Sequence, residues 1–194
     1  GRLAACFLDS IASLGYPGHG KTIRYEYGFF RQKFVNGKQV ELPDQWLSNG
    51  FVFEVRKPKH SVEVKFYGHA ETYLKANGEY ALRTVNATCV RAVPYDVSVP
   101  GYHNGVANTL RLWSAEPSGN NLPTDQSFED YLNTLKELCH GLYPDDSTEH
   151  GRMLRLRQQY FLVSAGLQSC MRSYYNRYHT LDGLDKAYVF QLND

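Results

Sequence analysis

The sequence predicts a mixed α/β fold whose sheet is extended by β-hairpins. Three observations predict it: an amphipathic helical pattern opens the chain, a block of alternating apolar residues follows, and two more helical patterns precede a short apolar run. The β-rich block contains two Asn-Gly pairs, which favour tight hairpin turns. A purely parallel sheet would not need such turns. We expect residues 1–194 to form a single partial domain.

The first predicted element is a helix over residues 2–14. Four apolar residues recur there at helical spacing, namely Leu3, Phe7, Ile11 and Leu14. Gly15 and Pro17 follow directly, and both residue types commonly end helices.

Residues 22–113 are predicted to be rich in strands. Alternating apolar side chains indicate two of them, Ile23, Tyr25 and Tyr27 in one and Val62, Val64 and Phe66 in the other. Asn36-Gly37 and Asn77-Gly78 each lie between apolar runs and predict hairpins. Residues 109–113 form a further short strand. A loop is expected around three turn-forming residues, namely Pro94, Pro100 and Gly101.

Two helices are expected after a polar loop at residues 116–124. The first spans about residues 127–140, and its apolar face consists of Phe128, Leu132, Leu135 and Leu138 or Cys139. The second spans about residues 150–176, and its apolar face consists of Met153, Leu156, Tyr160, Val163, Leu167 and Met171. The short loop between them, residues 141–149, is acidic.

The apolar run at residues 187–192 predicts a buried final strand that leads to Asp194. The carboxyl ends of strands are where α/β enzymes place their chemistry. No loop follows this strand, and no capping residue precedes the first helix. We therefore expect the sequence to be part of a longer one.

The composition excludes several classes of protein. Lys and Arg number 21 and Asp and Glu number 20, which argues against bulk attraction to nucleic acid or to an anionic membrane. No apolar run approaches the roughly 20 residues of a membrane span. No signal peptide is recognisable, so a cytoplasmic location is expected.

The four cysteines are isolated from one another, at positions Cys6, Cys89, Cys139 and Cys170. There is no CxxC pair, and the seven histidines show no ligand spacing. We expect neither a metal site nor a disulfide framework, and interpret the cysteines as buried free thiols in a reducing compartment.

Residues 15–22, GYPGHGKT, match the phosphate-binding P-loop pattern G-x-x-x-x-G-K-[ST]. A P-loop needs a strand before it and a helix after it, because the helix N-terminus directs its free N–H groups at the phosphates. Here a helix precedes the motif and a β pattern follows it, while Pro17 removes one N–H. We favour a glycine-rich helix-to-strand connection, with a P-loop nucleotide-binding protein as the alternative.

Five collinear stretches resemble the α-glucan (glycogen/maltodextrin) phosphorylase family. They are GRLAACFLDSIASLG at 1–15, KTIRYEYGFFRQKFVNGKQVE at 21–41, PYDVSVPGYHNGVANTLRLWSA at 94–115, LYPDDSTEHGRMLRLRQQYF at 142–161 and VFQLND at 189–194. The resemblance covers essentially the whole chain. It implies an internal part of the N-terminal domain of a protein several times longer.

The resemblance implies the GT-B architecture of glycosyltransferases, with two Rossmann-like domains that face each other across a cleft. It implies degradation of an α-1,4-glucan by inorganic phosphate with release of glucose 1-phosphate, in a homodimer that pairs through the helix at residues 127–140. It also implies pyridoxal phosphate as cofactor, bound to a lysine outside this chain. We therefore expect the chain alone to be inactive and to bind no pyridoxal phosphate covalently.

The resemblance assigns roles to individual residues. Asp146 matches the acidic residue of a mobile loop at the mouth of the active site, and Asp194 matches an aspartate that lines the cleft. We expect both to be catalytic. Ser147, Asp145 and Asn193 are expected to bind substrate, although Ser147 and Asp145 stand where the family usually has asparagine.

Two further positions are assigned through the resemblance. Gly1 matches the last glycine of a glycine-rich loop beside the cofactor. Arg172 is followed by Ser173, whereas the animal enzymes have paired arginines in their allosteric nucleotide site. The allosteric site is therefore incomplete, and we expect no activation by AMP.

From the residues alone, other interpretations stay open. Asp145 and Asp146 could form an ordinary solvated loop. Arg155 and Arg157 could face phosphate or coat the polar side of their helix, and we favour the polar coat. The 15 tyrosines and 10 phenylalanines leave a non-catalytic carbohydrate-binding module as a third hypothesis, because aromatic rings pack on sugar faces. Core packing is their more usual role.

Overall fold

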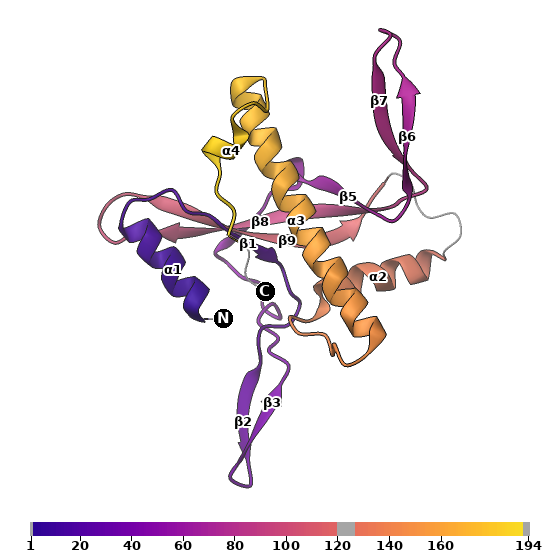
Figure 1. Cartoon of the computed structure of the whole chain (residues 1–194). Helices are drawn as coiled ribbons and strands as arrows, with labels where there is room; N and C mark the ends of the chain where they lie inside the picture. Colours follow the sequence, from indigo (N-terminus) through magenta and orange to yellow (C-terminus); the bar gives the residue numbers. More distant parts are fainter. Residues whose placement is uncertain (1, 120–126, 192–194) are drawn as a thin grey trace.

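The computed structural model describes residues 2–119 and 127–191. Its central sheet has the strand order β1-β9-β8-β4, and β5 also pairs with β8 (Figure 1). These strands are β1 (Gly20–Ile23), β4 (Glu54–Arg56), β5 (Val62–Phe66), β8 (Thr88–Pro100) and β9 (Ala107–Pro117). β1 runs parallel to β9 and the other pairs are antiparallel, so the sheet is mixed, as predicted.

Both predicted hairpins form, and they project in opposite directions from the central sheet (Figure 1). The first joins β2 (Arg31–Val35) to β3 (Lys38–Leu42), and the second joins β6 (His69–Leu74) to β7 (Tyr80–Val85). Asn36 and Gly37 have φ values of 50° and 73°, as the two central residues of a type I′ turn require. Each hairpin is a separate two-stranded sheet, so the hairpins do not widen the central one.

The helices cover both faces of the sheet. They are α1 (Arg2–Ser13), α2 (Phe128–His140), α3 (Glu149–Tyr178) and the short α4 (Leu184–Ala187), with a 3-10 turn at Pro58–His60. Lys21 of β1 reaches α3 through a hydrogen bond to Gly166, whereas the neighbouring Gly20 faces Leu8 of α1. Successive strand residues point to opposite faces, so α1 and α3 lie on opposite sides of the sheet.

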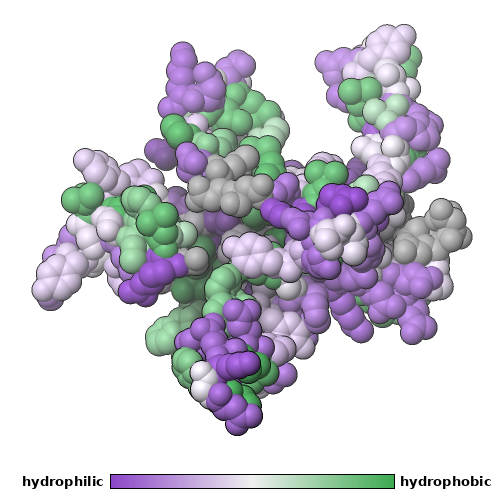
Figure 2. All heavy atoms as spheres, turned by 60° about the horizontal axis from the view of Figure 1, so that its bottom comes forward, coloured by the Kyte–Doolittle hydropathy of each residue, from purple (hydrophilic) through white to green (hydrophobic). Residues whose placement is uncertain are grey.

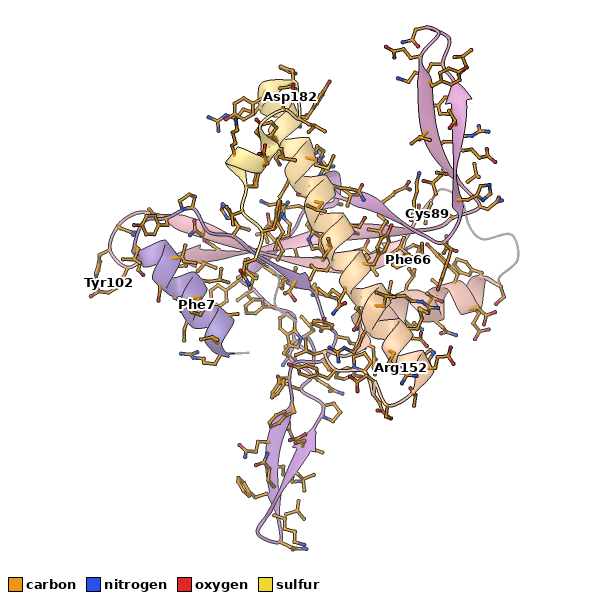
Figure 3. All side chains as sticks on the ribbon, viewed as in Figure 1. Phe7, Phe66, Cys89, Tyr102, Arg152 and Asp182 are labelled. Carbon is orange, nitrogen blue, oxygen red and sulfur yellow. The ribbon has the colours of Figure 1, made fainter. Side chains whose placement is uncertain are left out.

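One hydrophobic core lies between the sheet, α2 and α3. It contains Ile23, Val64, Phe66, Val90, Ala92, Trp113, Tyr131, Leu135, Leu138, Phe161 and Ala165. The buried hydroxyl of Tyr131 donates to the carbonyl oxygen of Cys89 at 2.8 Å and accepts from the amide of Ser118 at 3.0 Å. Figure 3 shows Phe66 beside α3, where its ring lies 5.4 Å from that of Tyr160. The predicted core side of α2 is thus confirmed at Leu135 and Leu138, whereas Phe128 is exposed.

The apolar face predicted for α3 is wrong. Met153, Leu156 and Tyr160 are between 42% and 58% exposed. The buried residues of α3 are mostly small or polar, namely Gly151, Gln158, Phe161, Ala165, Gly166, Ser169, Cys170 and Tyr174. Gln158 can be buried because its amide donates to two carbonyl oxygens, those of Leu138 and Gly141. Because such polar side chains are buried, a hydropathy pattern does not identify the buried face of this helix.

The loop predicted around Pro94 is also wrong, because Pro94 lies inside β8. On one edge, β8 pairs with β5 up to Ala92 and with β4 from Tyr95 onward. Pro94 lies at this change of partner, where the absence of its N–H interrupts neither ladder. Its carbonyl oxygen accepts from the amide of Lys57 at 2.8 Å. Pro100 does end the strand, as predicted.

The final strand predicted at residues 187–192 does not form over the described residues. Ala187 ends α4, and Val189 is 98% exposed. No strand in residues 2–119 or 127–191 pairs with this run, so its backbone lacks the ladder that a buried strand requires. The end of the run, Leu192, lies outside the described residues. Similarly, the strand predicted through Tyr27 ends at Ile23.

Apolar side chains also lie on the surface of α1. Leu3 and Phe7 of α1 are 70% and 58% exposed, as is Leu14 just after it at 71%, and Figure 2 shows apolar side chains on this helix. The nearby Cys6 is exposed as well, which corrects the prediction that all four thiols are buried. No helix in the described part of the chain is both long and apolar enough to cross a membrane.

Candidate functional site

The acidic loop, residues 141–148, connects α2 to α3 and ends in a folded turn. The carboxylate of Asp145 accepts from the amide of Ser147 at 3.1 Å. Hydrogen bonds from the side chain and the backbone of Ser147 lower the pKa of Asp145 below its usual value. The hydroxyl of Thr148 donates to the carbonyl oxygen of Asp145 and accepts from the amide of Gly151, and so caps α3. The loop therefore has a defined conformation at the start of a 30-residue helix.

Two arginines of α3 bind this loop. Arg155 forms an ion pair with Asp146, with 2.6 Å between Nη1 and Oδ2. Arg152, on the first turn of α3 (Figure 3), donates to the carbonyl oxygens of Asp146 and Ser147 at 3.2 Å each. Arg155 thus lies on the polar side of its helix, as predicted, and also binds the acidic loop. The other arginine of that prediction, Arg157, lies 5.6 Å from the centre of the Tyr67 ring.

Gly151 allows the acidic loop to pack directly on α3. A Cβ atom at this position would lie 1.8 Å from the carbonyl oxygen of Asp145, closer than any side chain can be. The obstacle is backbone, which cannot rotate away as a long side chain could. Only glycine therefore fits the observed path of the loop, and nothing in the residue pattern indicated this role.

The structure places three of the six predicted site residues. Asp145, Asp146 and Ser147 are consecutive and lie on the acidic loop, with Asp146 exposed at its surface. The other three, Gly1, Asn193 and Asp194, lie outside the described residues. In residues 2–119 and 127–191, no group of three or more His, Cys, Asp or Glu side chains could hold a metal ion.

The ion pair at Asp146 is expected to position the loop rather than to stabilise the fold. The side chains of Arg155 and Asp146 are 35% and 58% exposed, and exposed pairs contribute about 0–1 kcal/mol. Arg155→Gln is therefore expected to lower the free energy of unfolding by no more than about 1 kcal/mol in urea denaturation. A loss above about 3 kcal/mol would instead assign the pair a role in folding.

The glycine-rich segment at residues 15–22 is not a P-loop, so the nucleotide-binding hypothesis is wrong. α1 precedes the segment and β1 begins inside it at Gly20, the reverse of the required order. The segment is fixed to β9, because Asn108 donates to the carbonyl oxygen of Tyr16 and His19 accepts from the amide of Thr109. Lys21, the lysine of the motif, donates a hydrogen bond to the carbonyl oxygen of Gly166 on α3 and is not directed at a phosphate-binding loop.

A cavity of about 320 Å³ lies beside β1 and the segment that follows it. It is lined by Thr22, Ile23, Tyr25, Tyr27, Gly28, Phe29, Trp46, Phe51, Val97, Leu110, Leu112 and Leu142. Burial raises the pKa of Tyr25 to about 12, and the indole N–H of Trp46 already donates to the carbonyl oxygen of Tyr25. Sugar sites need several polar groups directed at hydroxyls. This apolar lining gives no support to a carbohydrate-binding module.

Arg172 has a structural role in this chain. Its guanidinium donates to the carbonyl oxygens of His60 and Ser61 at 2.7 and 3.1 Å, at the end of the 3-10 turn. The hydroxyl of the following Ser173 donates to the carbonyl oxygen of Ser169 on its own helix. The side chains of Arg172 and Ser173 therefore both donate hydrogen bonds to backbone carbonyl oxygens of this chain.

The whole chain, residues 1–194, matches the family described as carbohydrate phosphorylase. It is similar to the glycogen phosphorylase of Bacillus subtilis, at 48% identity over 198 residues that cover 100% of this chain and 24% of that protein. The Haemophilus influenzae glycogen phosphorylase is 46% identical, with 100% and 24% covered, and the human brain form is 42% identical, with 90% and 21% covered. The chain thus spans about a quarter of the length of these relatives. It belongs to the carbohydrate phosphorylase family.

Proposed function

We propose that the whole protein is an α-1,4-glucan phosphorylase of GT-B architecture and that this chain forms part of one wall of its catalytic cleft. The whole-chain similarity to proteins named glycogen phosphorylase is the observation that supports this most strongly. In the proposed reaction, the terminal glucosyl group of the glucan is transferred to inorganic phosphate with retained stereochemistry. Within this reaction, residues 1–194 act as one partial domain of a larger protein in the cytoplasm.

The acidic loop is proposed to face the sugar at the mouth of the cleft. The exposed carboxylate of Asp146 is held by Arg155, and the loop backbone is held by Arg152, so the loop can present a defined acidic surface. Asp146 is proposed to be catalytic, and Ser147 and Asp145 are proposed to bind the substrate. The Ser147 hydroxyl can donate or accept a hydrogen bond with a sugar hydroxyl. A wall that excludes water favours phosphate over water as the attacking group.

Asn193 and Asp194 are proposed to line the same cleft. Both residues follow the apolar run at residues 187–191, and their proposed place in the cleft rests on the family resemblance of the stretch VFQLND.

Pyridoxal phosphate is the cofactor proposed for the whole protein, with Gly1 beside it. The described residues do not form its site. The half-buried Lys21 is engaged by Gly166 and Cys170, and no cationic side chain lines the apolar cavity to bind a phosphate group. The chain alone is proposed to be inactive and to bind no pyridoxal phosphate covalently.

The whole protein is further proposed to be a homodimer that pairs through α2. One side of this helix packs in the core through Tyr131, Leu135 and Leu138. At the start of the helix, Phe128 is 60% exposed. No nucleic acid or membrane partner is proposed, since the formal net charge is only +1.

A chimera tests the proposed function. In it, this chain replaces the matching segment of the Bacillus subtilis relative, and the product is measured with maltooligosaccharide and inorganic phosphate as substrates. We expect release of glucose 1-phosphate that requires phosphate, with the unmodified relative as the control. A folded chimera that releases only free glucose, or nothing, would contradict the proposal.

A further inference from the structure

Lys21 and Cys170 form a contact that the proposed function does not use. Nζ of Lys21, on β1, lies 2.7 Å from Sγ of Cys170, on α3, and 3.1 Å from the carbonyl oxygen of Gly166. The two residues are 149 positions apart in sequence. The contact therefore joins the edge strand of the sheet to the helix that follows the acidic loop.

The distance between nitrogen and sulfur is shorter than a packing contact. Non-bonded carbon atoms in proteins approach to about 3.5–4.0 Å at their optimum, and sulfur is larger than carbon, so 2.7 Å is short for a contact between nitrogen and sulfur. It is also much longer than a direct sulfur–nitrogen bond. The separation fits two atoms that are both bonded to one light atom between them.

The surroundings direct the amine at the sulfur. Within residues 2–119 and 127–191, no carboxylate forms an ion pair with Lys21, and its hydrogen bonds go to Gly166 and Cys170. A Cβ atom on Gly166 would lie 3.4 Å from Cδ of Lys21, so this glycine leaves room for the lysine chain against α3. Cys170 is 8% exposed, which leaves access for a small oxidant rather than for a large thiol reagent.

We propose that Lys21 and Cys170 are a redox-sensitive pair that peroxide converts into an N–O–S cross-link. The lysine reacts as the neutral amine, after its ammonium group has given a proton to solvent. Two molecules of hydrogen peroxide each accept two electrons, one pair from the sulfur and one pair from the nitrogen. The S–H bond, one N–H bond and both O–O bonds break, and one oxygen atom becomes bonded to both nitrogen and sulfur. The other three oxygen atoms leave as three molecules of water.

Cys139 and Cys6 have different surroundings from Cys170. Cys139 accepts a hydrogen bond from the amide of Ala115, and burial raises the pKa of its thiol to about 11, which disfavours the reactive thiolate. Cys6 is exposed on α1 and is open to ordinary oxidation and disulfide exchange. Cys139 is therefore an internal control, and Cys6 must be replaced before the test.

The cross-link would close a covalent loop between β1 and α3. Closing a long loop reduces the conformational freedom of the unfolded chain and so raises stability. Oxidation would thereby hold α3, together with the acidic loop at its start, against the sheet. This consequence is independent of the reaction proposed for the whole protein.

The test uses the full 194-residue chain with Cys6→Ser, and in parallel the chimera with the same change. Each is treated with hydrogen peroxide, quenched, digested and analysed by mass spectrometry, with circular dichroism as the check on folding. We expect the peptides that contain Lys21 and Cys170 to be joined, with one oxygen atom gained and two hydrogen atoms lost. Reduction with dithiothreitol should separate them, and the oxidised protein should unfold at a higher temperature than the reduced one.

The matched control is Lys21→Arg, which retains the positive charge but removes the reacting amine. In this variant Cys170 should progress to sulfinic and sulfonic acids, and the thermal shift should disappear. Separate peptides after oxidation of the folded Cys6→Ser protein would overturn the proposal. A joined pair with no added oxygen would also overturn it, because the bond would then run directly from sulfur to nitrogen.

Discussion

Gly151→Ala in the chimera is expected to lower kcat for glucose 1-phosphate release by about 100-fold, the usual cost of displacing a positioning group by about 1 Å. The added methyl group would overlap the carbonyl oxygen of Asp145, at 1.8 Å, and the acidic loop would have to move away from α3. The measurement is steady-state release of glucose 1-phosphate. A stability loss of about 1–3 kcal/mol, measured by urea unfolding, should accompany it.

Gly141→Ala is the matched control, because Gly141 is the first residue of the acidic loop, whereas Gly151 lies on α3 just after the loop. Its φ of −140° suits any residue, and no atom lies within 4 Å of the position that a Cβ would occupy. This variant should retain the activity of the parent chimera. Equal activities for the Gly151 and Gly141 variants would show that the position of the loop does not matter to the reaction.

Asp96→Ala is expected to destabilise the chain by about 3–5 kcal/mol, the cost of leaving a buried charge without its partner. Asp96 Oδ1 and Oδ2 accept from Nε and Nη2 of Arg111 at 2.7 and 2.8 Å, and Lys57 Nζ lies 2.9 Å from Oδ2. The Asp96 side chain is only 9% exposed and that of Arg111 19%. Removal of the carboxylate leaves the guanidinium of Arg111 between β9 and α3, where Ser169 is its one remaining hydrogen-bond partner among residues 2–119 and 127–191. Urea denaturation at neutral pH measures the loss.

Glu71→Ala is the control for this prediction. Glu71 pairs with Arg83 on the β6–β7 hairpin, at 3.2 Å, but the two side chains are 42% and 60% exposed. Its removal should cost less than about 1 kcal/mol, as for other surface pairs. Similar losses for the Asp96 and Glu71 variants would contradict the structural role assigned to the buried pair.

The buried pair of Asp96 and Arg111 predicts that the stability of the fold depends on pH. Burial alone would raise the pKa of Asp96, but the hydrogen bonds from Arg111 and Lys57 hold this pKa below its usual value. Because the folded pKa lies below the unfolded value of about 3.9, the stabilisation is present above that pH and is lost as pH falls through the folded pKa. Unfolding measured between about pH 5 and pH 2 should show this loss, and the loss should be smaller in Asp96→Ala. An equal acid dependence in both proteins would contradict it.

Local sequence signals predicted much of the fold. Asn36-Gly37 specified its hairpin because two consecutive positive φ angles are easy only for such residues. Ser127 marked the start of α2, where its hydroxyl accepts from the amide of Asp130. The order of helix and strand around Lys21 was enough to reject a P-loop. Each of these features depends on a few neighbouring residues, so each was visible in the sequence.

Features that depend on distant partners were not predictable in this way. The buried side of α3 includes Gln158, whose partners come from α2 and the acidic loop. Pro94 fits inside β8 only because two different strands meet at that point on the edge. The role of Gly151 follows from the path of the backbone at Asp145, and no residue pattern encodes it. The carboxylate pair Asp145-Asp146 was found through the family resemblance, while its partner Arg155 was not.

Release of glucose 1-phosphate by the chimera with Asp146→Asn tests most directly whether this chain supplies an acidic loop to a phosphorylase cleft. The change keeps the shape of the side chain and removes the charge that pairs with Arg155. The control is Asp182→Asn, since Figure 3 shows Asp182 at the opposite end of α3 from Arg152. We predict a drop of about 100-fold for Asp146→Asn and an unchanged rate for Asp182→Asn. A rate for Asp146→Asn equal to that of the parent chimera would contradict the proposed role of the acidic loop.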